Sequence, residues 1–190
     1  SIQLHPVNDA PIFELTNVAN EVISSVDVYE DFATQTVKVL TGLIPDDETG
    51  QNVEYSIDPT SVSFANISID SNTGEVTIEK VDDDYGNQDF TITAIDDGGT
   101  DLNGENTYTQ NFTLNITSVN DVPSFVKGDD QPILEDSGLQ TIESWATNIS
   151  RGPADEIAQL LRFNITSTND DFFSQYPEVD PTTGTLRYQI

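Results

Sequence analysis

Apolar and polar residues alternate with a period of two in short runs over most of the chain. Alternation of this kind, in runs rich in Val, Ile, Thr, Phe and Tyr, is typical of strands with one buried face. The even spacing of the runs predicts a two-sheet sandwich. One other stretch, 154–161, could place Ile157, Leu160 and Leu161 on one helical face, and we expect a single turn there at most. The clearest strand-like runs are 36–39, 53–57, 64–69, 76–78, 90–94 and 111–116.

Two turns and two linkers recur along the chain. DSNTG at 70–74 is followed 110 residues later by DPTTG at 180–184, and each places Gly where a positive φ is expected. VNDAP at 7–11 is followed 112 residues later by VNDVP at 119–123. Each linker follows an alternating segment and precedes an aromatic residue, which is the order of last strand, linker and first strand of the next unit. A repeated linker at this spacing predicts repeated domains.

The linkers divide the chain into five segments. The fold class that they predict is all-β, with tandem Greek-key sandwiches of which the second is incomplete. The second unit ends soon after a strand predicted at 185–190, so by comparison with the first it lacks its last two strands. The segments are 1–6, the last strand of a preceding repeat; 7–11, a linker; 12–118, a complete sandwich; 119–123, a linker; and 124–190, a second, truncated repeat.

The two ends of the chain suggest an internal piece of a longer protein. Ser1 opens inside a strand-like pattern. Residues 1–6 of a neighbouring molecule, as a ready-made last strand, could dock into the second unit by strand addition. Alternatively, a longer chain was cut or became disordered after Ile190. Both explanations stay open.

The amino-acid composition excludes some classes of partner and of catalytic site. The chain has 34 Asp and Glu against 6 Lys and Arg, a formal charge of −28. Nucleic acid and anionic membranes are therefore poor partners and cations are natural ones, although acidity also serves solubility. There is no Cys and the only His is His5, so nucleophile and base arrangements of the Ser/His or Cys/His type are lacking. We therefore do not expect an enzyme.

The acidic residues gather at turns near the predicted strand ends. A single cluster of this kind is more often a solvated loop than a site. Hard divalent cations, however, take six to eight oxygen ligands from carboxylates, Asn side chains and carbonyls, so calcium is the expected ligand of several clusters together. The clusters include 30–31, 46–48, 82–84, 96–97, 135–136 and 155–156.

Two motifs resemble a known family. The segment IDSNTGEVTIEKVDDDYGNQDFTITAIDDGG, starting at Ile69, is similar to the cadherin stretch that runs from the TG turn through LDRE to A-x-D. VNDAP and VNDVP resemble the cadherin linker DxNDNxP. The chain thus looks like tandem cadherin-like repeats of the type found in large bacterial surface proteins and adhesins.

The resemblance implies Ca²⁺ ligands at the linkers. At the second linker the matching residues are Glu30, Asp82, Asp84, Asn120 and Asp121, joined by Asp155 or Glu156 from the following repeat. At the first linker they are Asn8, Asp9, Asp46, Glu48 and Asp96, while the donors of a preceding repeat are missing. The first Asp of DxNDN is Pro6 or Ser118 here, and its last Asn is Ala10 or Val122. Fewer ligands imply fewer ions than in the family.

The function implied is a calcium-binding structural or adhesive module of a secreted or cell-surface protein, with Ca²⁺ at the linkers making the array rigid. Its partners would be calcium and a cell-surface protein or polysaccharide, at the cell surface or outside the cell. The alternative is a calcium-dependent carbohydrate-binding module. An exposed aromatic platform would favour that alternative, but the sequence offers no obvious cluster of Trp and Tyr on one face, and Trp145 is expected in the core.

Overall fold

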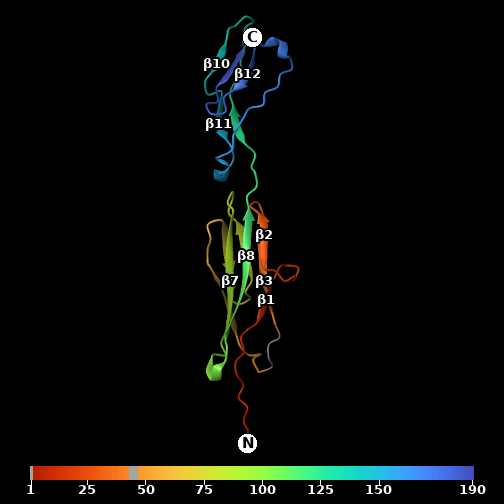
Figure 1. The fold of residues 1–190 in the computed structure, drawn as a ribbon, viewed down its shortest axis with the longest axis vertical. Coiled ribbons are helices and arrows are strands. Elements are labelled where there is room, and N and C mark those ends of the chain that lie inside the picture. Colours follow the sequence, from red (N-terminus) through yellow and green to blue (C-terminus); the bar gives the residue numbers. More distant parts are fainter. Residues whose placement is uncertain (1, 43–46) are drawn as a thin grey trace. The chain divides into compact units, whose positions relative to one another are not determined.

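A computed structural model describes residues 2–42 and 47–190, and these residues form an all-β chain (Figure 1). The chain divides into two compact units, Ser1–Val119 and Asn120–Ile190. Three short 3-10 helices are found among the described residues: η1 Asp101–Asn103, η2 Ala154–Glu156 and η3 Asp170–Phe172. The expected single turn within 154–161 is thus confirmed as η2. Within the described ranges, no helix has the length and apolar character needed to cross a membrane.

Unit 1 is a sandwich of two four-stranded sheets, ordered β1-β3-β6-β5 and β2-β8-β7-β4. The chain changes sheet after each of β1, β2, β3, β4 and β6, as in a Greek-key sandwich. β2 runs parallel to β8 over five residue pairs, from Ser25 opposite Thr113 to Tyr29 opposite Thr117. The strands of unit 1 are β1 Phe13–Thr16, β2 Ser25–Tyr29, β3 Gln35–Thr41, β4 Val53–Asp58, β5 Ala65–Ile69, β6 Val76–Lys80, β7 Gly86–Asp96 and β8 Thr107–Thr117.

The core of unit 1 lies between the two sheets and is filled by every second residue of the strands. Phe90, Ile92 and Ala94 of β7 and Leu114 of β8 are completely buried, and Phe90 stacks on Phe112 with ring centroids 5.3 Å apart. All six strands predicted from the alternation are confirmed. β7 and β8 are longer than predicted, because their outer ends continue with polar residues on both sides of the apolar run.

Unit 2 has a three-stranded sheet, β10-β13-β12, and a two-stranded sheet, β11-β9. Its buried core consists of Ala146, Val179, Leu186 and Tyr188, with Trp145 half-buried against it. Trp145 therefore lies at the edge of the core and donates to the carbonyl oxygen of Asp129 at 3.0 Å. The strands of unit 2 are β9 Ser124–Lys127, β10 Gln140–Ile142, β11 Ala146–Ser150, β12 Gln175–Val179 and β13 Leu186–Gln189.

The two units repeat one turn and one strand register. In unit 1, Asp70 Oδ1 accepts from the backbone N–H groups of Asn72 at 2.8 Å and Thr73 at 3.1 Å, and Gly74 has a φ of 71°. In unit 2, Asp180 Oδ1 accepts from Thr182 at 2.7 Å and Thr183 at 3.0 Å, and Gly184 has a φ of 67°. The two turns therefore share one geometry, and the positive φ expected at each Gly is confirmed.

The strand that pairs with the strand after the turn is continuous in unit 1 and interrupted in unit 2. Val37 of β3 lies opposite Val76, as Ile142 of β10 lies opposite Leu186. β3 then continues to Thr41, whereas in unit 2 a turn at 143–145 separates β10 from β11. One strand of unit 1 thus corresponds to two shorter strands of unit 2.

The strand expected at 1–6 is not formed by the described residues 2–6. Ile2 and Leu4 occupy the positions that match the buried Leu114 and Ile116 of β8 in the linker alignment, yet they are 95% and 90% exposed. A strand needs a neighbour for its backbone hydrogen bonds. The role of this segment as the last strand of another unit stays a prediction.

Candidate metal-binding ends of the units

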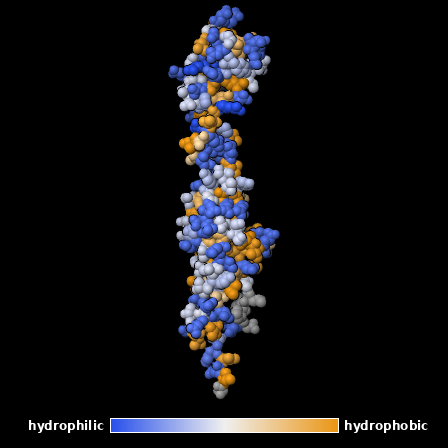
Figure 2. All heavy atoms as spheres, viewed as in Figure 1, coloured by the Kyte–Doolittle hydropathy of each residue, from blue (hydrophilic) through white to orange (hydrophobic). Residues whose placement is uncertain are grey.

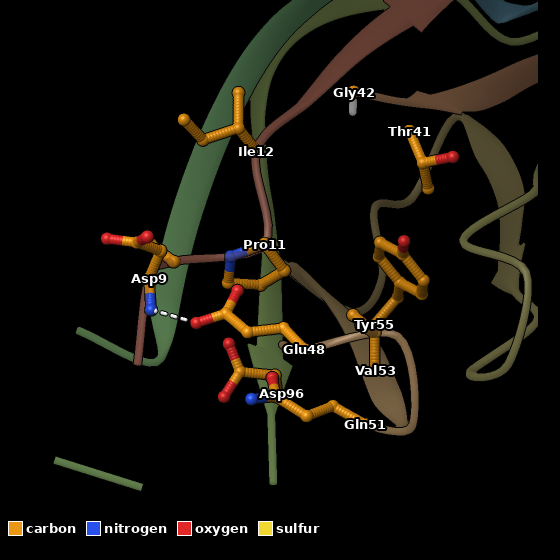
Figure 3. A pocket seen from close by; sticks show the side chains of 11 residues that line it. Asp9, Pro11, Ile12, Thr41, Gly42, Glu48, Gln51, Val53, Tyr55 and Asp96 are labelled. Atoms are coloured by element: carbon orange, nitrogen blue, oxygen red, sulfur yellow. Dashed lines mark hydrogen bonds between the residues drawn. The ribbon is translucent and has the colours of Figure 1, made fainter. Parts of the chain in front are cut away.

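The first linker is fastened to unit 1 by two acidic side chains. The backbone N–H of Asp9 donates to Oε1 of Glu48 at 2.5 Å (Figure 3). Asn8 donates through Nδ2 to Oδ1 of Asp96 at 2.9 Å, and Asp96 lies at the end of β7. Both carboxylates are buried, with Glu48 at 7% and Asp96 at 5% exposed. We call the group Asn8, Asp9, Glu48, Gln51 and Asp96 the entry of unit 1.

Asn8 is the most constrained residue of this entry. Its Nδ2 also donates to the carbonyl oxygen of Glu105 at 2.7 Å, and its Oδ1 accepts from Nε2 of Gln51 at 2.6 Å. The backbone N–H of Glu105 donates back to the carbonyl oxygen of Asn8 at 2.8 Å. A Cβ on Gly98 would lie 1.8 Å from Oδ1 of Asn8, so that position requires a residue without a side chain. The linker is therefore held by the loop between β7 and β8.

Two contacts of the first linker, that of Asp9 with Glu48 and that of Asn8 with Gln51, have counterparts at the start of unit 2. The backbone N–H of Asp121 donates to Oε1 of Glu156 at 2.6 Å, and Nε2 of Gln159 donates to Oδ1 of Asn120 at 3.0 Å. Glu156 is 3% exposed. We call the group Asn120, Asp121, Asp155, Glu156 and Gln159 the entry of unit 2.

Each entry is built on one motif, Asp-Glu-x-x-Gln, at 47–51 and 155–159. In each copy the Gln backbone N–H donates to the Glu carbonyl oxygen three residues earlier, at 3.0 Å for Gln51 and 2.9 Å for Gln159. This turn points the Glu and Gln side chains at the same linker. Our sequence reasoning selected the two Glu residues but missed the two Gln residues, although the 108-residue repeat of the motif was a visible signal.

The C-terminal end of unit 1 holds the remaining predicted ligands. Oε1 of Glu30 accepts from the backbone N–H of Val119 at 2.5 Å, and Glu30 is 2% exposed. Asp82 is exposed and forms an ion pair with Lys80 at 2.9 Å. Asp84 Oδ1 accepts from the backbone N–H of Tyr85 at 3.0 Å. We call Glu30, Asp82 and Asp84 the exit of unit 1.

Three of these carboxylates each keep a buried oxygen for which the described residues supply no hydrogen-bond donor: Oε2 of Glu30, Oδ2 of Asp96 and Oε2 of Glu156. A buried anionic oxygen without a donor or a counter-ion is costly. Such oxygens fit a hard cation, which binds carboxylate and amide oxygens. Within residues 2–42 and 47–190, however, no three acidic or His side chains converge closely enough to hold a metal. The ends thus supply suitable oxygens but no preformed cage.

The structure separates the predicted ligands into three sets. It brings Asn8, Asp9, Glu48 and Asp96 together at the entry of unit 1, and Asn120, Asp121 and Glu156 together at the entry of unit 2. The third set is the exit of unit 1, with Glu30, Asp82 and Asp84, and in it Asp82 forms an ion pair with Lys80. Asp155 belongs to η2 beside Glu156. Asp46 lies outside the described residues.

Neighbouring charged groups keep their ordinary charge states. Side-chain and backbone donors of Asn52 lower the pKa of Asp97, which follows Asp96 directly. Hydrogen bonds to Asp82 and Asp31 raise the pKa of Lys80. Lys80 is therefore a fixed cation at the exit of unit 1, and a metal ion at Asp82 would have to displace it.

Comparison with known proteins gives a weak likeness. No protein-family model matches the chain, and a search of curated proteins finds no match. Among solved structures, human protocadherin-24 EC1-2 aligns at 13% identity with a TM-score of 0.37, over 95% of this chain and 78% of that one. The human desmocollin-1 ectodomain aligns at 15% identity with a TM-score of 0.36, over 96% of this chain and 34% of that one. Mouse cadherin-23 EC22-24 aligns at 15% identity with a TM-score of 0.34, over 93% of this chain and 54% of that one.

These three structures are cadherin ectodomain repeats, and the chain spans about a third of desmocollin-1 and about half of the cadherin-23 fragment. At such TM-scores the likeness carries no conclusion about the site or the function of this chain. The fold class rests on the strands and sheets described above, which are those of an all-β protein.

Proposed function

We propose that the chain is a calcium-binding structural or adhesive module of a secreted or cell-surface protein. The observation that supports the proposal is a buried carboxylate oxygen to which the described residues supply no donor. Such an oxygen belongs to Asp96 at the entry of unit 1, to Glu30 at the exit of unit 1 and to Glu156 at the entry of unit 2. A formal charge of −28 adds a general demand for cations. The resemblance of VNDAP and VNDVP to cadherin linkers points to calcium as the cation.

The residues that would hold Ca²⁺ act in two ways. Glu48 and Glu156 use Oε1 to fix the linker backbone. We expect the second carboxylate oxygen of each Glu, together with the carboxylates of Asp9 and Asp121, to bind the ion. Bound calcium would neutralise carboxylates that otherwise repel one another. The linkers would then be stiffer with calcium than without it, which is the property that a tandem array of repeats needs.

The partners proposed for such a module are a cell-surface protein or a polysaccharide, and its place is the cell surface or the extracellular space. Strand addition of residues 1–6 to a neighbouring copy also remains a proposal. The exposed Ile2 and Leu4 support it, because they match core positions of β8. A strictly monomeric mass in solution at high protein concentration would contradict it.

Calcium titration of the thermal melting curve tests the main proposal. We expect an affinity of about 0.1–1 mM, as in extracellular modules. At tenfold excess over the dissociation constant, one site adds about 1.4 kcal/mol to the free energy of unfolding. Asp121→Ala should remove most of the melting shift of unit 2, which the fluorescence of Trp145 reports.

Asp130→Asn is the matched control, because Asp130 is an exposed acid of unit 2 whose contact is Lys127. It should keep the full calcium response. A melting curve that calcium leaves unchanged at tenfold excess over this range, or an equal loss of response in both variants, would contradict calcium binding at the entry of unit 2.

A further inference from the structure

The outer face of the β2-β8-β7 layer carries two exposed tyrosines in one row. Tyr29 ends β2 and lies opposite Thr117 of β8. On the other side of β8, Gly86 of β7 lies opposite Ile116, so the residue before it, Tyr85, reaches the level of Thr117. Figure 1 shows β2, β8 and β7 side by side in this order. The tyrosines thus flank one strand, about 10 Å apart for two inter-strand spacings.

The direction of both side chains follows from the residues beside them. Ile116 is buried in the core, and a Cβ on Gly86 would meet the ring of Phe64 at 2.5 Å, so both positions face inward. Because neighbouring strand residues point to opposite faces, Tyr29 and Thr117 face outward. Tyr85, just before β7, lines one hollow with Asn87 and Thr117. Tyr29 is 68% and Tyr85 is 45% exposed. Two large aromatic faces are therefore open to solvent on one side of the sheet.

A row of hydrogen-bonded polar side chains lies beside the tyrosines, and we call it the ladder: Ser25, Asp27, Asn115 and Asn87. Asn115 of β8 donates through Nδ2 to Oδ1 of Asp27 at 2.6 Å, and Asn87 of β7 donates to Oδ1 of Asn115. Ser25 donates to Oδ2 of Asp27 at 2.5 Å. These hydrogen bonds lower the pKa of Asp27, so it remains an ionised acceptor. The side chains of three strands are held in place by one another and keep further donor and acceptor positions toward solvent.

A shallow hollow joins one of the tyrosines, Tyr85, to the amide side chains of the ladder. Tyr85, Asn87, Asn115 and Thr117 line it. Aromatic faces beside fixed amide, hydroxyl and carboxylate groups match a ligand that has both apolar ring faces and many hydroxyl groups. Sugars are the class of molecule with that combination. Figure 2 shows hydrophilic residues over much of the visible face, which agrees with the large excess of acidic residues.

Charge decides between kinds of sugar. The nearest charged group of the ladder is Asp27, and the chain has 34 acidic against 6 basic residues. An anionic polysaccharide would be repelled. We propose that Tyr29, Tyr85, Asn87 and Asn115 form a binding site for a neutral oligosaccharide, with the sugar rings against the tyrosines and their hydroxyl groups bonded to the ladder.

The site stands next to two carboxylates of the exit of unit 1, because Tyr29 precedes Glu30 and Tyr85 follows Asp84. The inference itself depends on the outer face of the sheet and is independent of calcium. The binding measurements are therefore made both with calcium at about 1 mM, the range of extracellular modules, and with a chelator. Binding under either condition supports the site, so failure of the calcium proposal and failure of this one remain distinguishable.

The experiment is an NMR titration of the full chain with cellohexaose, maltohexaose and mannohexaose, and with hexagalacturonic acid as the anionic comparison. At about 10 mM sugar, well above the range of weak single-site affinities, at least one neutral hexasaccharide should shift the amide signals of residues 27–29, 85–89 and 113–117. Hexagalacturonic acid should not. Tyr29→Ala and Tyr85→Ala should each weaken binding by about tenfold, the upper range for one aromatic contact.

Tyr176→Ala is the matched control, because Tyr176 is a 41% exposed tyrosine of unit 2. It should bind as the unchanged chain does, and the melting temperatures of all three variants should agree within error. The inference is overturned if no neutral hexasaccharide shifts those amides under either condition, or if the double variant at Tyr29 and Tyr85 binds as tightly as the unchanged chain.

Discussion

The entries of the two units share one device but differ in how much else holds the linker. In both, a buried Glu accepts from the linker Asp N–H, at 2.5 Å for Glu48 and 2.6 Å for Glu156. In both, a Gln three residues later donates to the linker Asn. In unit 1 the linker Asn8 also bonds to Asp96 and to the backbone of Glu105. Asn120 accepts from Gln159 and donates through Nδ2 to the carbonyl oxygen of its neighbour Asp121 at 2.9 Å.

The difference teaches which part of the entry both units share and which depends on further strands. The Glu and Gln contacts come from one short turn that both units contain, and they join residues 35 to 43 positions apart in sequence. Asp96 and Glu105 come from β7 and the β7–β8 loop, and residues up to Ile190 give unit 2 no counterpart of these elements. The same contrast appears in the core, in which 15 of the described residues of unit 1 and four of unit 2 are buried. Unit 2 should therefore respond more strongly to matched changes.

The largest expected difference lies at the glycines of the repeated turn. A Cβ at Gly184 would lie 1.8 Å from the backbone oxygen of Ala146, whereas at Gly74 it would meet side chains of Val39 and Tyr55. Both positions have positive φ, which costs an L-residue about 1–2 kcal/mol. Because backbone yields less easily than side chains, Gly184→Ala should cost about 4 kcal/mol or more and Gly74→Ala about 2–3 kcal/mol.

Urea unfolding separates the two variants. Trp145 reports unit 2 by fluorescence, and resolved amide signals of β7 and β8 report unit 1. Each substitution should act on its own unit. If Gly184→Ala and Gly74→Ala lower the free energy of unfolding of their own units by the same amount, the contacts around each turn do not set the size of the loss.

A smaller difference is expected at the two glutamines. Gln159→Ala removes a hydrogen bond worth about 1 kcal/mol and leaves the Asn120 side chain with its bond to the adjacent carbonyl of Asp121, so that side chain should become more mobile. Gln51→Ala removes the same kind of bond, but Asn8 keeps Asp96 and the carbonyl of Glu105. The amide-group order parameters of Asn120 should fall and those of Asn8 should stay nearly constant.

Nitrogen relaxation measurements check this, with Gln131→Ala as control, because Gln131 is an exposed glutamine of unit 2 that bonds to Asp129. Loss of order at Asn8 equal to that at Asn120 would contradict the importance of the β7–β8 contacts.

The smallest effect is the pH response of the two turn aspartates. Backbone donors lower the pKa of Asp70 and of Asp180 below the ordinary value of 3.8. The carboxylate contribution is therefore fully present above about pH 4 and is lost as the pH falls through each folded pKa. Carbonyl carbon titration by NMR should give both values below 3.8 and close to each other. A value at or above 3.8 for either residue would mean that its turn is not closed in solution.

Much of the fold follows from the sequence alone. Six strands of unit 1 and the repeated turn were predicted, because alternation and a Gly at positive φ are local signals. β2 was missed, since it is a short edge strand with only Val26 and Val28 facing the core side. The outer ends of β7 and β8 were missed because they pair through backbone bonds while carrying polar residues on most positions. Such pairing depends on a partner strand and leaves no local pattern.

The candidate sites divide in the same way. Asp9, Glu48, Asp121 and Glu156 were selected from motifs as calcium ligands. The structure shows the contacts of Asp9 with Glu48 and of Asp121 with Glu156, while their role as ligands stays a prediction. The ion pair of Asp82 with Lys80 was not predicted, although the two residues are close in sequence. Tyr29 and Tyr85 are 56 residues apart in sequence. They flank the same part of β8 because β2 and β7 both pair with that strand. A sequence without alignment gives no signal for that arrangement.

The parallel pairing of β2 with β8 has a mechanical consequence. β2 follows β1 at the beginning of unit 1, and β8 leads directly into the second linker. Tension along the chain would pull these two strands in opposite directions along their length, so the hydrogen bonds between the five residue pairs would be loaded together in shear. Bonds loaded together resist force better than bonds opened one after another. Once tension has separated β1 from β3, the strand that supports Tyr29 and Glu30 is thus also part of the pairing that resists further extension.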